Sequence, residues 1–206
     1  MLIATERGVM AGRPREFDRE AALEAAMLLF WRKGFAAASM NDLCDAMGVR
    51  SPSLYAAFES KEALYLAAIK HYVLIHGQPV WDRLADGATA REGIENLLAA
   101  AVETLPKSRM TPAGCMAVLA AVSDEWPAPI AREIRKVRLD MLGSLRTRLE
   151  AAVANGELAA TTDIEALSRF YLSVFQGMAI QSKDGATPAE LKGAAEAAMA
   201  AWPNDD

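Results

Sequence analysis

The segment from residue 39 to residue 58 constrains the fold most, because it predicts two short helices joined by a tight turn. Ser39 is a good N-cap, and apolar residues follow it at helical spacing. Gly48 stands where the chain leaves the first helix, in a position where glycine readily adopts the left-handed conformation. Ser51 is predicted to cap the second helix, with Pro52 in its first turn. The pattern is typical of a helix-turn-helix, which places its second helix in the major groove of DNA.

The second of these helices has two different faces. Leu54 and Phe58 are four residues apart and are predicted to point into a core. The outer face keeps short or hydroxyl-bearing side chains, which let a helix approach the floor of a DNA groove closely; they are Ser53, Tyr55, Ala56 and Ala57. An ordinary helical hairpin is the alternative, but its exposed face would more often be rich in Glu and Lys. The outer face therefore favours DNA binding.

Helical patterns flank this pair on both sides. A helix capped by Asp18 is expected before it, and another is expected to run from Lys61 towards residue 76 and to end near Pro79. Lys61 stands at the positive N-terminal end of its helix, where its own charge is unfavourable. That placement is explained if a phosphate lies there, because helix N-termini and lysine both bind phosphate.

Several short motifs occur in register between residues 17 and 72. They are Ala25-Ala26-Met27-Leu28-Leu29-Phe30, Lys33-Gly34-Phe35, Ser39-Met40, Ala46-Met47-Gly48-Val49, Ser51-Pro52-Ser53-Leu54-Tyr55 and Phe58-Glu59-Ser60-Lys61-Glu62-Ala63-Leu64. With these motifs the region resembles the N-terminal domain of TetR-type transcriptional regulators. The resemblance implies a three-helix DNA-binding head and a larger helical body that dimerises and usually holds an inducer pocket.

The resemblance also implies roles for single side chains. Contacts to phosphate are implied for Ser39, Tyr55 and Lys61, and positions near base edges for Ser51 and Ser53. The pair Ala56-Ala57 departs from the family pattern, which often has a bulkier or polar residue there, although an alanine methyl can touch a thymine methyl. The predicted DNA-binding set is completed by Arg50, Pro52, Ala57, Arg13 and Arg15.

The chain is expected to divide into three parts. Residues 1–16 would form a flexible arm, residues 17–60 the head, and residues 61–206 a regulatory and dimerisation body. Arg13 and Arg15 of the arm could enter an adjacent minor groove, where arginine is favoured, or the arm could be a solvated tail. The resemblance assigns dimerisation to the last two helices, residues 163–183 and 187–201; alternatively their faces only close the core of one monomer.

Charge and composition fit a protein that touches DNA with one end. The formal net charge is −5, yet residues 1–61 hold eight positive and eight negative side chains, so the body carries the whole excess. Abundant alanine favours an all-α chain, with about nine helices expected. No secretory signal and no bilayer-spanning apolar run is apparent, and two cysteines make no disulfide framework. A cytoplasmic protein is expected.

The sequence allows two kinds of sensing site in the body. Its aromatic and methionine side chains could line an apolar pocket or simply fill the core. Cys115 follows Gly114 at the start of a predicted buried helix over residues 114–122, where a helix dipole lowers the pKa of a thiol. The resemblance implies that such a cysteine senses electrophiles or oxidants, and a small buried hydrophobe is the alternative. The candidate sensor residues are Cys115, Met116, Trp81, Trp126, Tyr171 and Phe175.

No motif predicts an enzyme. A glycine-rich phosphate loop, a nucleophile elbow and a metal-ligand cluster are not apparent, and His71 and His76 do not have the i, i+4 spacing of a helical metal pair. No metal or other cofactor is expected. The sequence predicts a homodimeric, ligand- or thiol-responsive repressor that binds a palindromic DNA operator. The alternative is an activator, or a DNA-binding protein without a small-molecule ligand.

Overall fold

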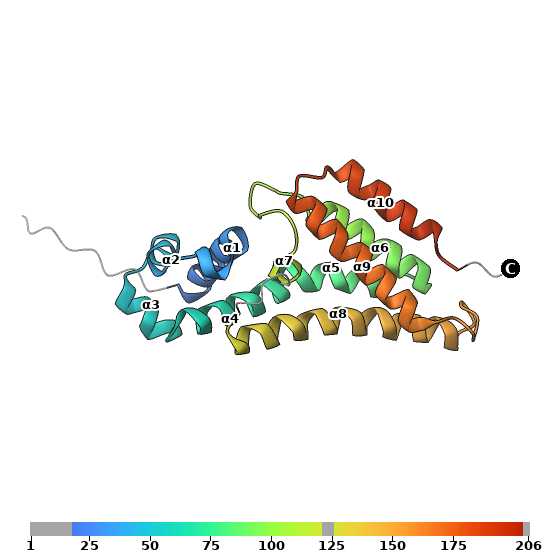
Figure 1. The fold of residues 1–206 in the computed structure, drawn as a ribbon, viewed down its shortest axis with the longest axis horizontal. Helices are drawn as coiled ribbons and strands as arrows, with labels where there is room; N and C mark the ends of the chain where they lie inside the picture. Colours follow the sequence, from blue (N-terminus) through green and yellow to red (C-terminus); the bar gives the residue numbers. More distant parts are fainter. Residues whose placement is uncertain (1–17, 121–125, 204–206) are drawn as a thin grey trace, which may run out of the picture.

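The computed structural model describes residues 18–120 and 126–203. Every regular element in these ranges is helical, in agreement with the predicted all-α class. A small group of helices, which we call the head, lies at one end of an elongated molecule, and the larger body extends from it (Figure 1). The predicted arm, with Arg13 and Arg15, lies outside the described residues.

The head consists of α1 (Arg19–Ala37), α2 (Met40–Met47) and α3 (Ser51–Phe58). Asp18 caps α1 as predicted, because its side chain accepts hydrogen bonds from two backbone N–H groups of the first turn. Gly34 interrupts α1 with a φ of +77°. The apolar faces of the three helices meet in a core to which Ala26, Met27, Phe30, Leu43, Leu54 and Phe58 contribute.

The turn between α2 and α3 has the predicted left-handed glycine, since Gly48 has a φ of +66°. The predicted cap of α3 is wrong by one residue. Arg50 is the N-cap, without a capping side-chain bond, and Ser51 is the first residue of the helix. The reason is that the Arg50 carbonyl opens the helical ladder, accepting from the N–H groups of Ser53 at 2.9 Å and Leu54 at 3.1 Å.

One long helical stretch connects the head with the body. It comprises α4 (Lys61–Tyr72), a π-helical turn η1 (Val73–Gly77), α5 (Gln78–Asp82) and a 3₁₀ turn η2 (Arg83–Ala85). The predicted end near Pro79 is wrong, because this proline lies in the first turn of α5, where its missing N–H costs little. The ring of Tyr65 in α4 packs edge-on against Phe30 of α1, with centroids 4.9 Å apart.

The remaining body helices are α6 (Ala90–Thr104), α7 (Met116–Leu119), α8 (Ala128–Ala154), α9 (Ile164–Lys183) and α10 (Pro188–Ala200). Helix α8 runs beside α4 and α5, while α6, α9 and α10 pack together above them (Figure 1). The body core is formed by their apolar faces, including Leu97, Leu98, Leu145, Leu149, Met178 and Leu191.

The predicted helix over residues 114–122 is much shorter within the described residues. Helix α7 has four residues and starts after Cys115. Gly114 has a φ of +82°, and a Cβ there would lie 2.8 Å from the carbonyl oxygen of Ala179 in α9. Gly114 is therefore not helical, and the helix begins two residues later, after the N-cap Cys115. The end of the predicted segment, from residue 121, lies outside the described residues.

Candidate DNA-binding surface and ligand cavity

The two faces of α3 differ as the sequence suggests. Leu54 and Phe58 are buried in the head, whereas Tyr55 is 47% exposed. The other outward side chains at the start of the helix, Ser51, Pro52 and Ser53, are also exposed, and Ala57 is half-buried. Helix α3 contains no acidic residue. Its N-terminal end therefore presents the exposed hydroxyl groups of Ser51 and Ser53, which suit a phosphate-bearing partner.

Ser39 and Lys61 lie at two other helix starts. The Ser39 hydroxyl accepts from the N–H of Asp42 at 3.0 Å and donates to its carboxylate at 2.8 Å. The Lys33 ammonium lies 3.0 Å from the same carboxylate. The hydrogen bond from Lys33, and to a smaller extent those from Ser39, lower the pKa of Asp42 to about 2. The Lys61 ammonium lies 4.5 Å from the centre of the Phe35 ring. These contacts hold both side chains in place beside the exposed face of the head.

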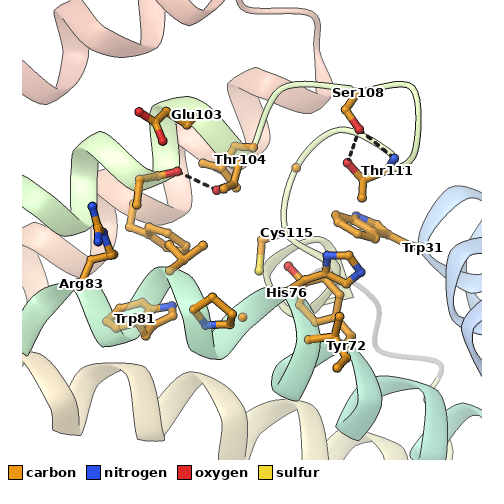
Figure 2. Close-up of a pocket in the computed structure, with 18 of the residues that line it drawn as sticks. Trp31, Tyr72, His76, Trp81, Arg83, Glu103, Thr104, Ser108, Thr111 and Cys115 are labelled. Carbon is orange, nitrogen blue, oxygen red and sulfur yellow. Dashed lines mark hydrogen bonds between the residues drawn. The ribbon is translucent and has the colours of Figure 1, made fainter.

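A cavity of about 430 Å³ lies in the body, beside η1 and α5. Three predicted sensor residues, Trp81, Cys115 and Phe175, line it. Its wall also includes side chains that sequence reasoning missed, among them Trp31, Tyr72, His76, Ser108 and Thr111 (Figure 2). Trp31 belongs to α1, so the head contributes directly to a cavity of the body.

The thiol of Cys115 is buried in this wall, with only 2% of the residue exposed. Burial raises the pKa of Cys115, although the Tyr72 side chain that hydrogen-bonds the thiol acts in the opposite direction. The predicted lowering of this pKa is therefore wrong. The following helix, α7, has only four residues, and its dipole does not offset the loss of solvation.

The other predicted sensor residues lie elsewhere. Met116 and Trp126 line a separate cavity of about 300 Å³, where Trp126 packs against Phe35 and Tyr65. Tyr171 is buried against Trp202, and its hydroxyl lies 3.4 Å from the Ala198 carbonyl. Tertiary packing thus divides the predicted sensor set between the first cavity, the second cavity and the core.

Contacts with α1 also join the histidines of the body to the head. His71 Nε2 lies 2.8 Å from one carboxylate oxygen of Glu24, and His76 Nε2 lies 3.7 Å from the other. Among the described residues no group of three or more His, Cys, Asp or Glu side chains could hold a metal ion. None of the helices in the described ranges has both the length and the apolarity of a bilayer span.

Family models match both parts of the chain. The model of the TetR family of bacterial regulatory proteins matches residues 22–68, and a tetracycline repressor-like C-terminal domain model matches residues 90–202. The chain belongs to the TetR family. It is a transcription regulator with a DNA-binding helix-turn-helix head.

Full-length relatives support this membership. The chain is 33% identical over 202 residues to the HTH-type transcriptional repressor ComR of Escherichia coli K12, covering 93% of this TetR-family chain and 92% of ComR. It is 29% identical over 199 residues to the repressor BdcR of the same organism, covering 97% and 95%. A solved structure of a cysteine mutant of the TetR-family regulator CifR, complexed with 26-base-pair operator DNA, is 41% identical. Its TM-score is 0.86, and the match covers 93% of this chain and all of that one.

Proposed function

We propose that this TetR-family regulator is a homodimeric repressor that leaves its DNA operator when a small molecule fills the cavity beside η1. One observation carries the proposal: Trp31 of α1 forms part of the cavity wall, so an occupant touches the head itself. The DNA-binding residues are those on the outer face of α3 and at the neighbouring helix starts, including Tyr55 and Lys61.

Repression is supported by the relatives that match along the whole chain. ComR and BdcR, named repressors, match over 93% and 97% of it. FasR of Mycolicibacterium smegmatis, named an activator, is 42% identical over 60 residues and covers only 29% of the chain. The similarity to an activator is therefore confined to about the size of the head, a part that both kinds of regulator need.

The proposed dimer forms through α9 and α10. On α9 the large apolar side chains Phe170 and Ile180 are 39% and 44% exposed, and a partner helix would cover them. Two heads would then enter successive major grooves of a palindromic operator, about one helical turn apart. Ligand binding would favour a dimer geometry in which the heads no longer match that spacing. The protein would act by binding alone, without catalysis, and in the cytoplasm.

Binding to DNA from the region flanking its own gene tests the proposal. Tyr55→Ala and Lys61→Ala should each weaken binding about tenfold, as expected for the loss of a phosphate contact. Fluorescence anisotropy at several salt concentrations measures affinity, and sedimentation checks that the dimer stays intact. Lys70→Ala is the matched control, because Lys70 is exposed in the last turn of α4, away from the helix start. Unchanged affinity in both test variants would contradict the assigned surface.

A thiol response is a second candidate function, favoured by the presence of the Cys115 thiol in the cavity wall. One neighbour of similar fold is described as the reduced form of Escherichia coli NemR, at 21% identity and a TM-score of 0.73. If thiol modification releases DNA, N-ethylmaleimide should weaken operator binding of the natural protein and of Cys44→Ser, but not of Cys115→Ser. Release that persists in Cys115→Ser would place the sensing group elsewhere.

A further inference from the structure

Two indole N–H groups on the cavity wall have no hydrogen-bond acceptor among the described residues. They are Trp31 Nε1 and Trp81 Nε1, whereas His76 Nε2 lies 3.7 Å from a carboxylate oxygen of Glu24. Trp31 is 7% exposed, so its indole is more than nine-tenths buried. A buried donor without an acceptor costs free energy that a bound acceptor recovers. This set of donors therefore indicates which atoms a ligand should bring.

Aromatic rings surround Trp31 at its end of the cavity. The His76 ring lies 5.4 Å from the Trp31 ring and 5.7 Å from the Tyr72 ring, measured between centroids. Figure 2 shows Trp31 and His76 at the same end of the cavity, whereas Trp81 lies at the other end. An acceptor oxygen beside Trp31 would meet the indole N–H group, and the aromatic rings beside it would stack on a flat ligand.

Charged ligands fit this wall poorly. A cation would face N–H groups that point their positive ends at it. An anion would face the carboxylate of Glu103, and the one guanidinium on the wall, Arg83, already pairs with Asp86 at 2.9 Å. Apolar side chains such as Ile75, Val80 and Phe175 line much of the remaining wall. The volume of about 430 Å³ is within the range of small-molecule sites.

We infer that the cavity binds an uncharged aromatic molecule with a carbonyl or ether oxygen, which accepts a hydrogen bond from Trp31. The inference rests on the proposed function and adds the chemical class of the ligand. Trp31 then has two tasks, since it selects an oxygen acceptor and connects the ligand to α1. Trp81 would bind a second acceptor, where the ligand has one at its other end.

Benzophenone and diphenylmethane form a matched pair of probes, because they differ only in a carbonyl group in place of a methylene. Equilibrium dialysis against the purified full-length protein should show that benzophenone binds about tenfold more tightly than diphenylmethane. Trp31→Phe keeps an aromatic ring and removes the N–H group. In this variant the preference for the ketone should fall to near onefold, while diphenylmethane binds as before.

Trp126→Phe is the matched control, because Trp126 Nε1 also lacks an acceptor among the described residues but lines the other cavity. It should keep the full preference. Equal binding of the two probes, no binding of benzophenone, or an undiminished preference in Trp31→Phe would overturn the inference. DNA binding is measured on the same preparations. If the protein binds DNA in the absence of the probes and the probe result fails, only the ligand class is refuted, whereas a failure to bind DNA without any probe refutes the proposed function.

Discussion

The polar groups on the outer face of α3 are exposed to water, whereas the indole N–H groups on the cavity wall are buried. On α3 the side chain of Tyr55 is 47% exposed and hydrated, and the proposed contact with DNA would displace that water. In the cavity the N–H group of Trp31 is buried and has no acceptor among the described residues. A contact with DNA replaces a contact with water, whereas a ligand acceptor would satisfy a group that the fold leaves unsatisfied. The exposed polar groups of α3 are therefore satisfied by water before DNA binds, whereas the buried indole N–H group of the cavity is satisfied only when a ligand binds.

Gly34 of the head and Gly114 of the cavity wall have similar φ values, +77° and +82°, and their substitution should give the largest difference between the two regions. Gly114→Ala should lower the free energy of unfolding by about 3 kcal/mol, because it combines a strained φ with overpacking against α9. Gly34→Ala should cost only about 1 kcal/mol, from the strained φ alone. At Gly34 nothing lies within 4 Å of an added Cβ, whereas at Gly114 the nearest atom is 2.8 Å away.

Urea denaturation followed by circular dichroism measures both losses. A native-like far-ultraviolet spectrum before denaturation is the control for correct folding. Equal losses for the two variants would contradict the prediction, because they would show that the segment around Gly114 accommodates an added methyl group without overpacking.

The two cysteines compare the same regions by chemical reactivity. Cys44 of the head is half-buried, whereas Cys115 is buried and its pKa lies above the ordinary value of 9.0. Because only the thiolate reacts, labelling of Cys115 by Ellman's reagent should be slow at neutral pH and should accelerate about tenfold per pH unit up to and beyond pH 9. Cys44→Ser isolates the reaction of Cys115, and Cys115→Ser isolates that of Cys44. Rapid labelling of Cys115 at pH 7 would contradict the buried, protonated thiol.

The smallest effect concerns two helix caps. In the head, Lys33 and Ser39 lower the pKa of Asp42 from 3.8 to about 2, and in the body the bonds from Thr187 lower the pKa of Glu190. A lowered pKa means that the contribution to stability is present above the ordinary pKa and is lost as pH falls towards the folded value. Between pH 4 and 2 the melting temperature of the natural protein should fall. Asp42→Asn should reduce this fall more than Glu190→Gln does.

Thermal melting over this pH range measures the difference. Both side chains are on the surface, so the effects should shrink in high salt. A larger effect of Glu190→Gln would show that the backbone cap, rather than the Lys33 ion pair of the head, dominates.

Much of the head could be predicted because its signals are local. The cap at Ser39, the left-handed Gly48 and the i, i+4 pair Leu54 and Phe58 are all properties of a few neighbouring residues, and the structure has each of them. The capping box of Thr187 and Glu190 at the start of α10 is local in the same way. The one-residue error at Ser51 is of the size expected for helix boundaries.

The cavity could be predicted only in part. Cys115 and Phe175 are 60 residues apart in the sequence and come together because α9 packs beside the loop before α7. Trp31 has no sequence signal of a ligand contact, since its spacing in α1 is that of an ordinary core residue. The reversal of the Cys115 pKa also needed the structure, because the sequence shows a helix start but not how deeply the thiol is buried.

The helical class, the caps at Ser39 and Thr187, the turn at Gly48 and the two faces of α3 follow from local sequence patterns, because they depend on interactions within about one helical turn. Long-range packing places Trp31 of the head in one cavity with Trp81 and Cys115 of the body, and it keeps Met116, Trp126 and Tyr171 out of that cavity. Burial and the partners of a polar atom depend on distant segments, whose packing is set by the shapes of all the apolar faces together.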